Sequence, residues 1–144
     1  MNNLIKNIRN IGRISDIRKF RYLIDEYNCN DYKKWIRYNK GDYTRNVVYR
    51  DMNFEILLLC WDEYSLAKIH DHSDNGCFLK VLEGNLNEIR YDKNLKIVKN
   101  EILYPNNISY IHNNMGYHSI NNLNKKSVSL HIYSPPNHIS NKIT

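Results

Sequence analysis

The stretch IHDHSDNGC at residues 69–77 brings together side chains that can bind a metal ion. Two histidines, His70 and His72, lie two positions apart, and Cys77 follows them. Successive side chains of a β-strand point to opposite faces, so a strand here would turn both imidazoles the same way, roughly 6–7 Å apart. Asp71 would point to the other face. The pair is therefore a candidate for holding one metal ion with two imidazole ligands.

Later polar residues could complete such a site. His118, in GYHSIN, could supply a third imidazole from another strand. In SVSLHIY, at residues 127–133, Ser129, His131 and Tyr133 alternate with apolar residues. A polar run that faces the inside of a barrel indicates a cavity that carries chemistry. The alternative is that the polar face meets solvent and the apolar face forms the core, and periodicity alone leaves both interpretations open.

These residues fall on short β-like runs that begin after Gly41, and turn residues separate the runs. Many short strands at regular spacing predict a mainly β fold, either a sandwich or a barrel. We expect strands near residues 43–50, 54–61, 65–72, 77–83, 85–91, 95–99, 108–112, 116–121 and 127–133.

About two short helices are expected ahead of the strands. Residues 14–27 have apolar side chains at the i, i+3, i+4, i+7 spacing of one helix face, with Ser15 as the predicted N-cap. A shorter helix is expected over 30–37, and Gly41 would end it. The last stretch, SPPNHISNKIT at 134–144, is expected to be irregular. The whole chain of 144 residues suits one domain, with a helical part at about 14–38 and a barrel at about 43–136.

The composition of the chain limits the classes of binding partner and the cellular compartment that we expect. No apolar run approaches the roughly 20 residues of a membrane span, and the N-terminus does not resemble a secretory signal. Three cysteines at irregular spacing argue against a disulfide framework and favour a reducing, cytoplasmic location. The net charge of +6 admits nucleic-acid binding, but the basic residues do not cluster into a recognition helix. We therefore expect neither a nucleic acid nor a membrane as partner, and a monomer.

The motif HDHSDNGCFLKVLEGNLNE, at residues 70–88, resembles the first metal-binding motif of the cupin barrels. Most cupins have a ligand glutamate where this chain has Cys77, and a glycine seven residues later, here Gly84. A cysteine at that position resembles the cysteine dioxygenase family. Four more segments resemble the same family in the same order: YTRN at 43–46, ILLLCW at 56–61, MGYHSINN at 115–122 and SVSLHIYSPP at 127–136. The resemblance implies a jelly-roll β-barrel.

The resemblance also implies roles for individual residues. His70, His72 and His118 match the three ligands of a mononuclear Fe(II). Three imidazoles bring no negative charge, unlike the common two-histidine, one-carboxylate set. An uncharged set suits a substrate whose thiolate supplies the anionic ligand, while open positions remain for O2.

Other matched positions surround the expected iron. Arg45 corresponds to the residue that binds the substrate carboxylate, for which a guanidinium fork is well suited, and Tyr43 would share its face. Tyr133 corresponds to the active-site tyrosine, with His131 and Ser129 orienting its hydroxyl. Cys77 and Tyr133 match the pair that forms a thioether crosslink in animal-type members, a bond that would fix the ring without being essential for turnover.

The expected activity is oxidation of L-cysteine by O2 to cysteine sulfinic acid. Arg45 favours cysteine over another small thiol, such as 3-mercaptopropionate, because the enzymes for that substrate tend to carry glutamine at this position. An alternative from another class is a non-catalytic cupin module that binds a metal. A nucleic-acid binder, the third alternative, rests only on the net charge.

Overall fold

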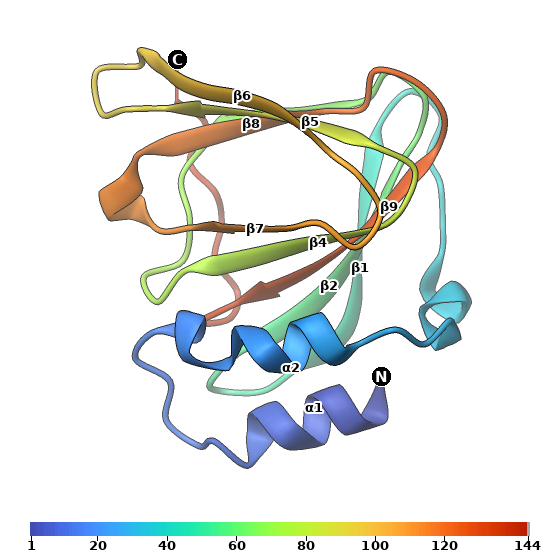
Figure 1. The fold of residues 1–144 in the computed structure, drawn as a ribbon, viewed down its shortest axis with the longest axis vertical. Coiled ribbons are helices and arrows are strands. Elements are labelled where there is room, and N and C mark those ends of the chain that lie inside the picture. Colours follow the sequence, from blue (N-terminus) through green and yellow to red (C-terminus); the bar gives the residue numbers. More distant parts are fainter. Residues whose placement is uncertain (144) are drawn as a thin grey trace.

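A computed structural model of the protein describes residues 1–143 and consists of two antiparallel β-sheets with helices on one side (Figure 1). The nine strands are β1 (Tyr43–Arg50), β2 (Glu55–Trp61), β3 (Leu66–His70), β4 (Cys77–Glu83), β5 (Leu86–Tyr91), β6 (Ile97–Leu103), β7 (Ile108–Ile111), β8 (Tyr117–Asn121) and β9 (Ser127–Tyr133). One sheet has the order β1-β2-β9-β4-β7 and the other β3-β8-β5-β6. The predicted mainly β architecture is confirmed, although the strand expected at 95–99 runs from Ile97 to Leu103.

The helical region begins earlier than residue 14, with α1 (Asn2–Arg9). The helix predicted over 14–27 is shorter: a 3₁₀ turn at Ile17–Phe20 leads into α2 (Arg21–Glu26). Asp16 rather than Ser15 caps it, because the Asp16 carboxylate accepts the backbone N–H of Arg18 at 2.9 Å. The second predicted helix is a 3₁₀ turn at Asp31–Trp35.

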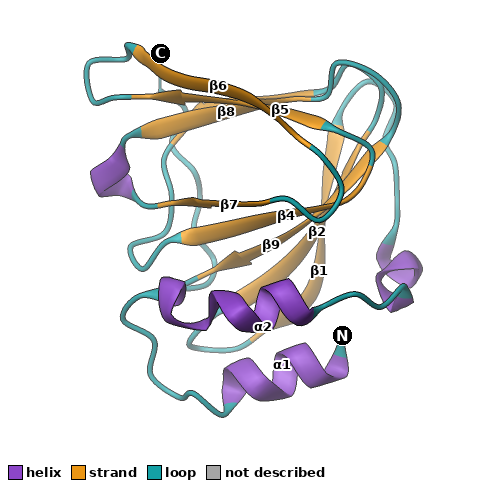
Figure 2. Ribbon diagram, in the orientation of Figure 1, coloured by secondary structure: helices purple, strands orange, loops and turns teal. Residues whose placement is uncertain are grey.

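The central strands of the five-stranded sheet are buried on both faces. The outer face of this sheet packs against α1 and α2, which cross below it in Figure 2, and its inner face looks across the barrel to the smaller sheet. Strand β9 shows the consequence, because all seven of its residues are buried. Val128, Leu130 and Ile132 pack in the core under the helices, whereas Tyr133 belongs to the core inside the barrel. The polar face of β9 is therefore turned inward and does not meet solvent.

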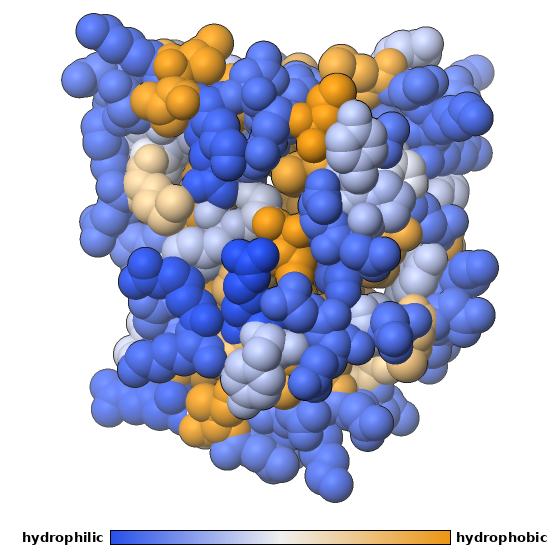
Figure 3. Space-filling view, in the orientation of Figure 1, coloured by the Kyte–Doolittle hydropathy of each residue, from blue (hydrophilic) through white to orange (hydrophobic). Residues whose placement is uncertain are grey.

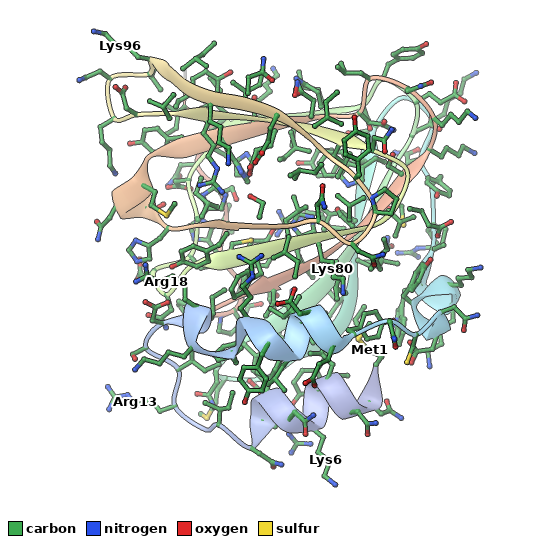
Figure 4. The ribbon with its side chains drawn as sticks, viewed as in Figure 1. Met1, Lys6, Arg13, Arg18, Lys80 and Lys96 are labelled. Carbon is green, nitrogen blue, oxygen red and sulfur yellow. The ribbon has the colours of Figure 1, made fainter. Side chains whose placement is uncertain are left out.

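A buried lysine joins the helices to this sheet. Lys80, in β4, is 3% exposed, and its ammonium donates to the backbone carbonyls of Ile24 and Tyr27 at 2.9 and 2.7 Å. Figure 4 places it between the sheet and the end of α2. The Ile24 carbonyl also accepts the Tyr27 N–H at 3.3 Å, so Lys80 adds a second donor there and supplies a donor for the Tyr27 carbonyl beyond the end of α2.

The chain after β9 returns to the free edge of β3. The Ser134–Pro135 peptide bond is cis. Further on, Ile143 donates its N–H to the carbonyl of Ile69 at 2.9 Å, and Lys142 lies directly opposite His70. The stretch predicted to be irregular lacks regular structure for most of its length, yet its end pairs with β3. None of the helices in residues 1–143 is long and apolar enough to cross a membrane. The face shown in Figure 3 is mostly hydrophilic, with separate apolar patches.

Candidate metal centre

Three histidines, two from the neighbouring strands β3 and β8 and one from the loop after β3, meet inside the barrel. His70 ends β3 and lies opposite His118 of β8 in the sheet register. The expectation that one strand carries both His70 and His72 is wrong, because β3 stops at His70. His72 is fixed by Asn113 instead, whose side chain accepts the His72 N–H and donates to its carbonyl, both at 2.9 Å. The two imidazoles still converge, although the alternation of a strand is not the cause.

The ring nitrogens of the three histidines are close enough to share one ion. Nε2 of His118 lies 2.8 Å from Nε2 of His72 and 3.2 Å from Nε2 of His70. The possible ligand atoms all lie within 4.8 Å of one another. His72 and His118 are buried, and His70 is partly exposed toward a cavity.

The protonation of these rings leaves lone pairs pointing at one another. Nδ1 of His70 lies 2.6 Å from the carbonyl of Lys68, and Nδ1 of His118 lies 2.7 Å from the Glu88 carboxylate. Both acceptors require an N–H, so Nε2 of each ring carries the lone pair. Burial and the neighbouring His118 lower the pKa of His70 to about 4, and burial likewise lowers the pKa of His72. Imidazole lone pairs that converge in this way fit a metal cation.

A buried carboxylate that the sequence analysis missed supports His118. Glu88, in β5, is 0% exposed, and its oxygens accept from the Ser109 hydroxyl at 2.8 Å and from Nε of Arg90 at 3.1 Å. Burial raises the pKa of Glu88, but hydrogen bonding to His118 and the charge of Arg90 outweigh it and bring the pKa to about 2. Its signal was present in the sequence: Glu88 alternates in phase with the apolar Leu86 and so faces the interior.

A chain of hydrogen bonds leads to Tyr133. Nε1 of Trp61 donates to Oγ of Ser129 at 2.9 Å, Ser129 lies 2.7 Å from Nε2 of His131, and Nδ1 of His131 lies 3.2 Å from the Tyr133 hydroxyl. An indole only donates, so Ser129 accepts from Trp61 and has its own hydrogen available for Nε2 of His131. In the tautomer that accepts it, the ring hydrogen is on Nδ1 and donates to Tyr133, which leaves the tyrosine hydrogen for a group in the cavity.

Burial keeps the members of this chain uncharged. Burial and the charge of Arg45 lower the pKa of His131, and burial and the nearby Cys77 raise the pKa of Tyr133. Cys77 lies directly opposite Tyr133 in the register of β4 and β9, and burial raises the pKa of its thiol. The cysteine is therefore placed against the tyrosine and lies outside the histidine cluster.

A cavity of about 540 Å³ opens onto these groups. Of the predicted site residues, its wall contains Tyr43, Arg45, His70, His118, His131 and Tyr133. The Arg45 guanidinium carbon lies 5.8 Å from the centre of the Tyr133 ring, and Tyr43 stacks on Trp61 at 4.8 Å between ring centres. The structure thus brings Arg45 and Tyr43 to the same wall as His70 and His118, whereas His72 and Cys77 are not part of that wall.

Comparison with known proteins identifies the family. The family model of cysteine dioxygenase type I matches residues 2–143. Cysteine dioxygenase type 1 from rat is 38% identical over 133 residues, covering 84% of this chain and 66% of the rat protein. The zebrafish protein of that name is 33% identical over 150 residues, covering 94% of this chain and 75% of its own length. The chain thus spans about two thirds of the length of the rat relative.

Solved structures agree on the fold. A double-stranded β-helix protein from Klebsiella pneumoniae superposes with a TM-score of 0.65 at 14% identity, covering 81% of this chain and 96% of that one. A cupin superfamily protein from Desulfitobacterium hafniense gives a TM-score of 0.61 at 11% identity, with 76% and 92% covered. The resemblance seen in five separate segments of the sequence is confirmed: the chain folds as a cupin barrel and belongs to the cysteine dioxygenase type I family.

Proposed function

We propose that this protein is an iron-dependent thiol dioxygenase that converts L-cysteine and O2 to cysteine sulfinic acid. The observation that carries the proposal is that two members of the three-histidine cluster, His70 and His118, share one cavity wall with Arg45 and Tyr133. Family membership supports the same activity. Both oxygen atoms of O2 end on the sulfur of one thiol, so the reaction balances without an external reductant.

His70, His72 and His118 would hold the iron. Neutral imidazole ligands bring no charge, so a thiolate could offset part of the charge of Fe(II) without competing with a protein carboxylate. When bound, Fe(II) supplies the centre at which the thiolate and O2 react. The protein's part is to fix the lone pairs of His70 and His118 through their Nδ1 partners and to keep Glu88, the carboxylate beside His118, engaged by its own hydrogen bonds.

The cavity wall provides groups for the rest of the substrate. The Arg45 guanidinium can bind the carboxylate of cysteine in a bidentate manner. The Tyr133 hydroxyl, whose hydrogen is left unused by His131, can donate to the substrate or to oxygen. Tyr43 is held by its stacking on Trp61 and borders the same space beside Arg45.

The proposal includes a thioether between the Cys77 sulfur and a Tyr133 ring carbon. The two side chains are direct cross-strand neighbours, a position in which Cβ atoms lie about 4.5–5.5 Å apart. Forming the bond removes one hydrogen from each partner, and O2 would be the oxidant. We also expect a cytoplasmic monomer, a location in keeping with the three free cysteines.

The decisive experiment identifies the product. Fe(II)-loaded protein is supplied with L-cysteine and O2, and mass spectrometry should find a product heavier than cysteine by two oxygen atoms. His118→Ala should bind less iron and form no sulfinate. Iron binding without sulfinate would indicate a non-catalytic metal-binding module, and faster turnover of 3-mercaptopropionate would show that cysteine is not the preferred thiol.

Arg45→Ala tests the carboxylate site separately. Loss of a charge-assisted pair should raise KM for L-cysteine by roughly 10–100-fold, from the roughly 1.5–3 kcal/mol of such hydrogen bonds. Iron content should not change, because Arg45 is absent from the histidine cluster. An unchanged KM would exclude Arg45 as the carboxylate-binding residue.

A further inference from the structure

The free edge of β3 is covered by a segment that follows β9. We call residues 137–143 the strap. The Ile143 N–H donates to the Ile69 carbonyl at 2.9 Å, the Asp71 N–H donates to the Asn141 carbonyl at 3.3 Å, and Lys142 lies opposite His70. These pairings form a short antiparallel ladder on the strand that ends at a metal-binding histidine.

Asp71 fastens the strap from the outer side. Its Oδ1 accepts from the Asn141 N–H at 2.7 Å and from Nε2 of His138 at 3.0 Å, and its Oδ2 accepts from Nδ2 of Asn141 at 2.9 Å. Three hydrogen bonds thus converge on the residue between His70 and His72. Asp71, which lies outside the metal-binding cluster, has a structural use of its own.

The register decides where Lys142 points. Residues directly opposite each other in an antiparallel pair present their side chains on the same face. His70 faces the cavity, so Lys142 faces it too, and Lys142 is part of the cavity wall. Lys142 also lines a smaller hollow together with Arg45, Lys68, Tyr43 and Asp42. Within residues 1–143, no carboxylate forms an ion pair with Lys142.

We propose that Lys142 is a second binding residue for the substrate carboxylate, held beside Arg45 by the strap that Asp71 fastens. This inference rests on the proposed function. A carboxylate has about four acceptor positions, and a bidentate guanidinium uses two of them. An ammonium on a flexible stem can engage one of the others as a point charge. The strap therefore supplies a residue for recognition as well as part of the cavity wall.

The first test measures binding without turnover. Calorimetry on Fe(II)-loaded protein in the absence of O2 compares L-cysteine with cysteamine, which has the same thiol and amine but no carboxylate. Lys142→Gln should weaken cysteine binding roughly fivefold, the size expected of an exposed ion pair. Cysteamine binding and iron content should not change. An equal loss for both ligands, or no loss for cysteine, would overturn the assignment.

Two further lysines serve as controls. Lys96 lies at the turn between β5 and β6, where Figure 4 shows it pointing away from the barrel, and Lys96→Gln should leave cysteine binding unchanged. Lys68 shares the hollow with Lys142, so Lys68→Gln tests whether any nearby positive charge has the same effect. A loss in Lys68→Gln as large as that in Lys142→Gln would contradict a specific role for Lys142.

The second test concerns the strap itself. Asp71→Ala should speed hydrogen exchange of the Ile143 amide by about tenfold or more, because the ladder loses its fastening. Asn141→Ala removes the side-chain bond while leaving Asp71 in place, and it should raise the exchange rate by a smaller factor. Asp74, an exposed residue four positions after His70, provides the matched control, Asp74→Ala. Unchanged protection in Asp71→Ala would refute the fastening.

The outcomes separate the two proposals. If the wild-type protein fails to bind and oxidise L-cysteine, the proposed function fails, and the role of Lys142 with it. If the wild type oxidises cysteine while Lys142→Gln binds it normally, the proposed function stands and only the second carboxylate contact is wrong.

Discussion

At the scale of single residues, hydrogen-bond partners distinguish the buried histidines more than burial does. His118 and His131 are both buried. A carboxylate faces Nδ1 of His118, which leaves Nε2 free for a metal ion, whereas Ser129 and Tyr133 engage both nitrogens of His131. One histidine is thus set up as a ligand and the other as a connector. The hydrogen-bond partners support the same division of roles that the family resemblance implied.

Glu88 is the residue whose role the structure adds to this set. Glu88→Gln should lower iron affinity by about 10–100-fold, the usual effect of removing a carboxylate that supports a ligating histidine. Equilibrium metal titration would measure it. Glu101→Gln is a suitable control, because Glu101 lies opposite Glu88 on β6 but pairs with Lys99 near the surface. Equal affinities for the two variants would show that Glu88 does not orient His118.

Cys77 offers a test of the crosslink. A cysteine–tyrosine thioether would lower the intact mass of the wild-type protein by two hydrogens. Cys77→Gly should abolish this mass difference and should retain substantial activity. Cys60→Ser is the control, since Cys60 is equally buried but lies opposite Val128 and packs in the core under the helices. If the two-hydrogen mass difference persists in Cys77→Gly, the bond involves other residues.

At the scale of elements, the strands could be predicted from the sequence. The positions that the strands give to the site residues could be predicted only in part. The alternation of polar and apolar residues in SVSLHIY predicted β9 with the correct bounds, because this alternation is regular over the whole strand. The same rule placed His70 and His72 on one strand, yet β3 ends at His70 because Asn113, remote in sequence, binds the backbone of His72. A contact between distant segments is invisible to local periodicity.

The N-terminal helices show the same limit. The apolar spacing at 14–27 found the face that packs on the sheet, but the chain forms a 3₁₀ turn before α2. The short α1 was missed, since eight residues have little intrinsic helix stability and depend on packing. Leu4 and Ile8 of α1 are buried in the core that it shares with the sheet.

Lys80 tests the connection between helices and sheet. Lys80→Ala removes the hydrogen-bond donor for carbonyls at the end of α2, and we expect a loss of roughly 2–3 kcal/mol in the free energy of unfolding. Urea denaturation would measure it. Lys96→Ala, at an exposed turn, should change stability by no more than about 0.5 kcal/mol. Similar values for the two variants would mean that the buried ammonium contributes nothing.

At the scale of the whole molecule, the buried histidines make stability depend on pH. In the metal-free protein, burial lowers the pKa values of His70, His72 and His131, and His70 reaches about 4. The unfolded chain, with histidine pKa values near 6.5, therefore binds more protons below that pH. Stability should be fully present above pH 6.5 and should fall as the pH drops, by up to about 1.4 kcal/mol per pH unit for each histidine.

Urea unfolding of the metal-free protein at pH 7, 6 and 5 would reveal this slope. Most carboxyl groups stay ionised over this range, so histidines dominate it. His131→Gln should reduce the slope by one histidine's share, which separates the effect from a simple loss of stability. Equal unfolding free energies at pH 7 and 5 would show that these histidines are protonated in the folded state.

The burial of β9 on both faces has a consequence for sequence change. Along β9, residues that face the barrel form the hydrogen-bonded chain to Tyr133, and those that face the helices pack in the core. Selection should therefore act on adjacent positions of β9 for different reasons, on one for the barrel-facing hydrogen bonds and on the next for core packing. A library of every single substitution across 127–133, scored in parallel for abundance and for activity per molecule, should separate into two interleaved sets. Natural sequence variation along residues 127–133 should alternate between the same two sets of positions.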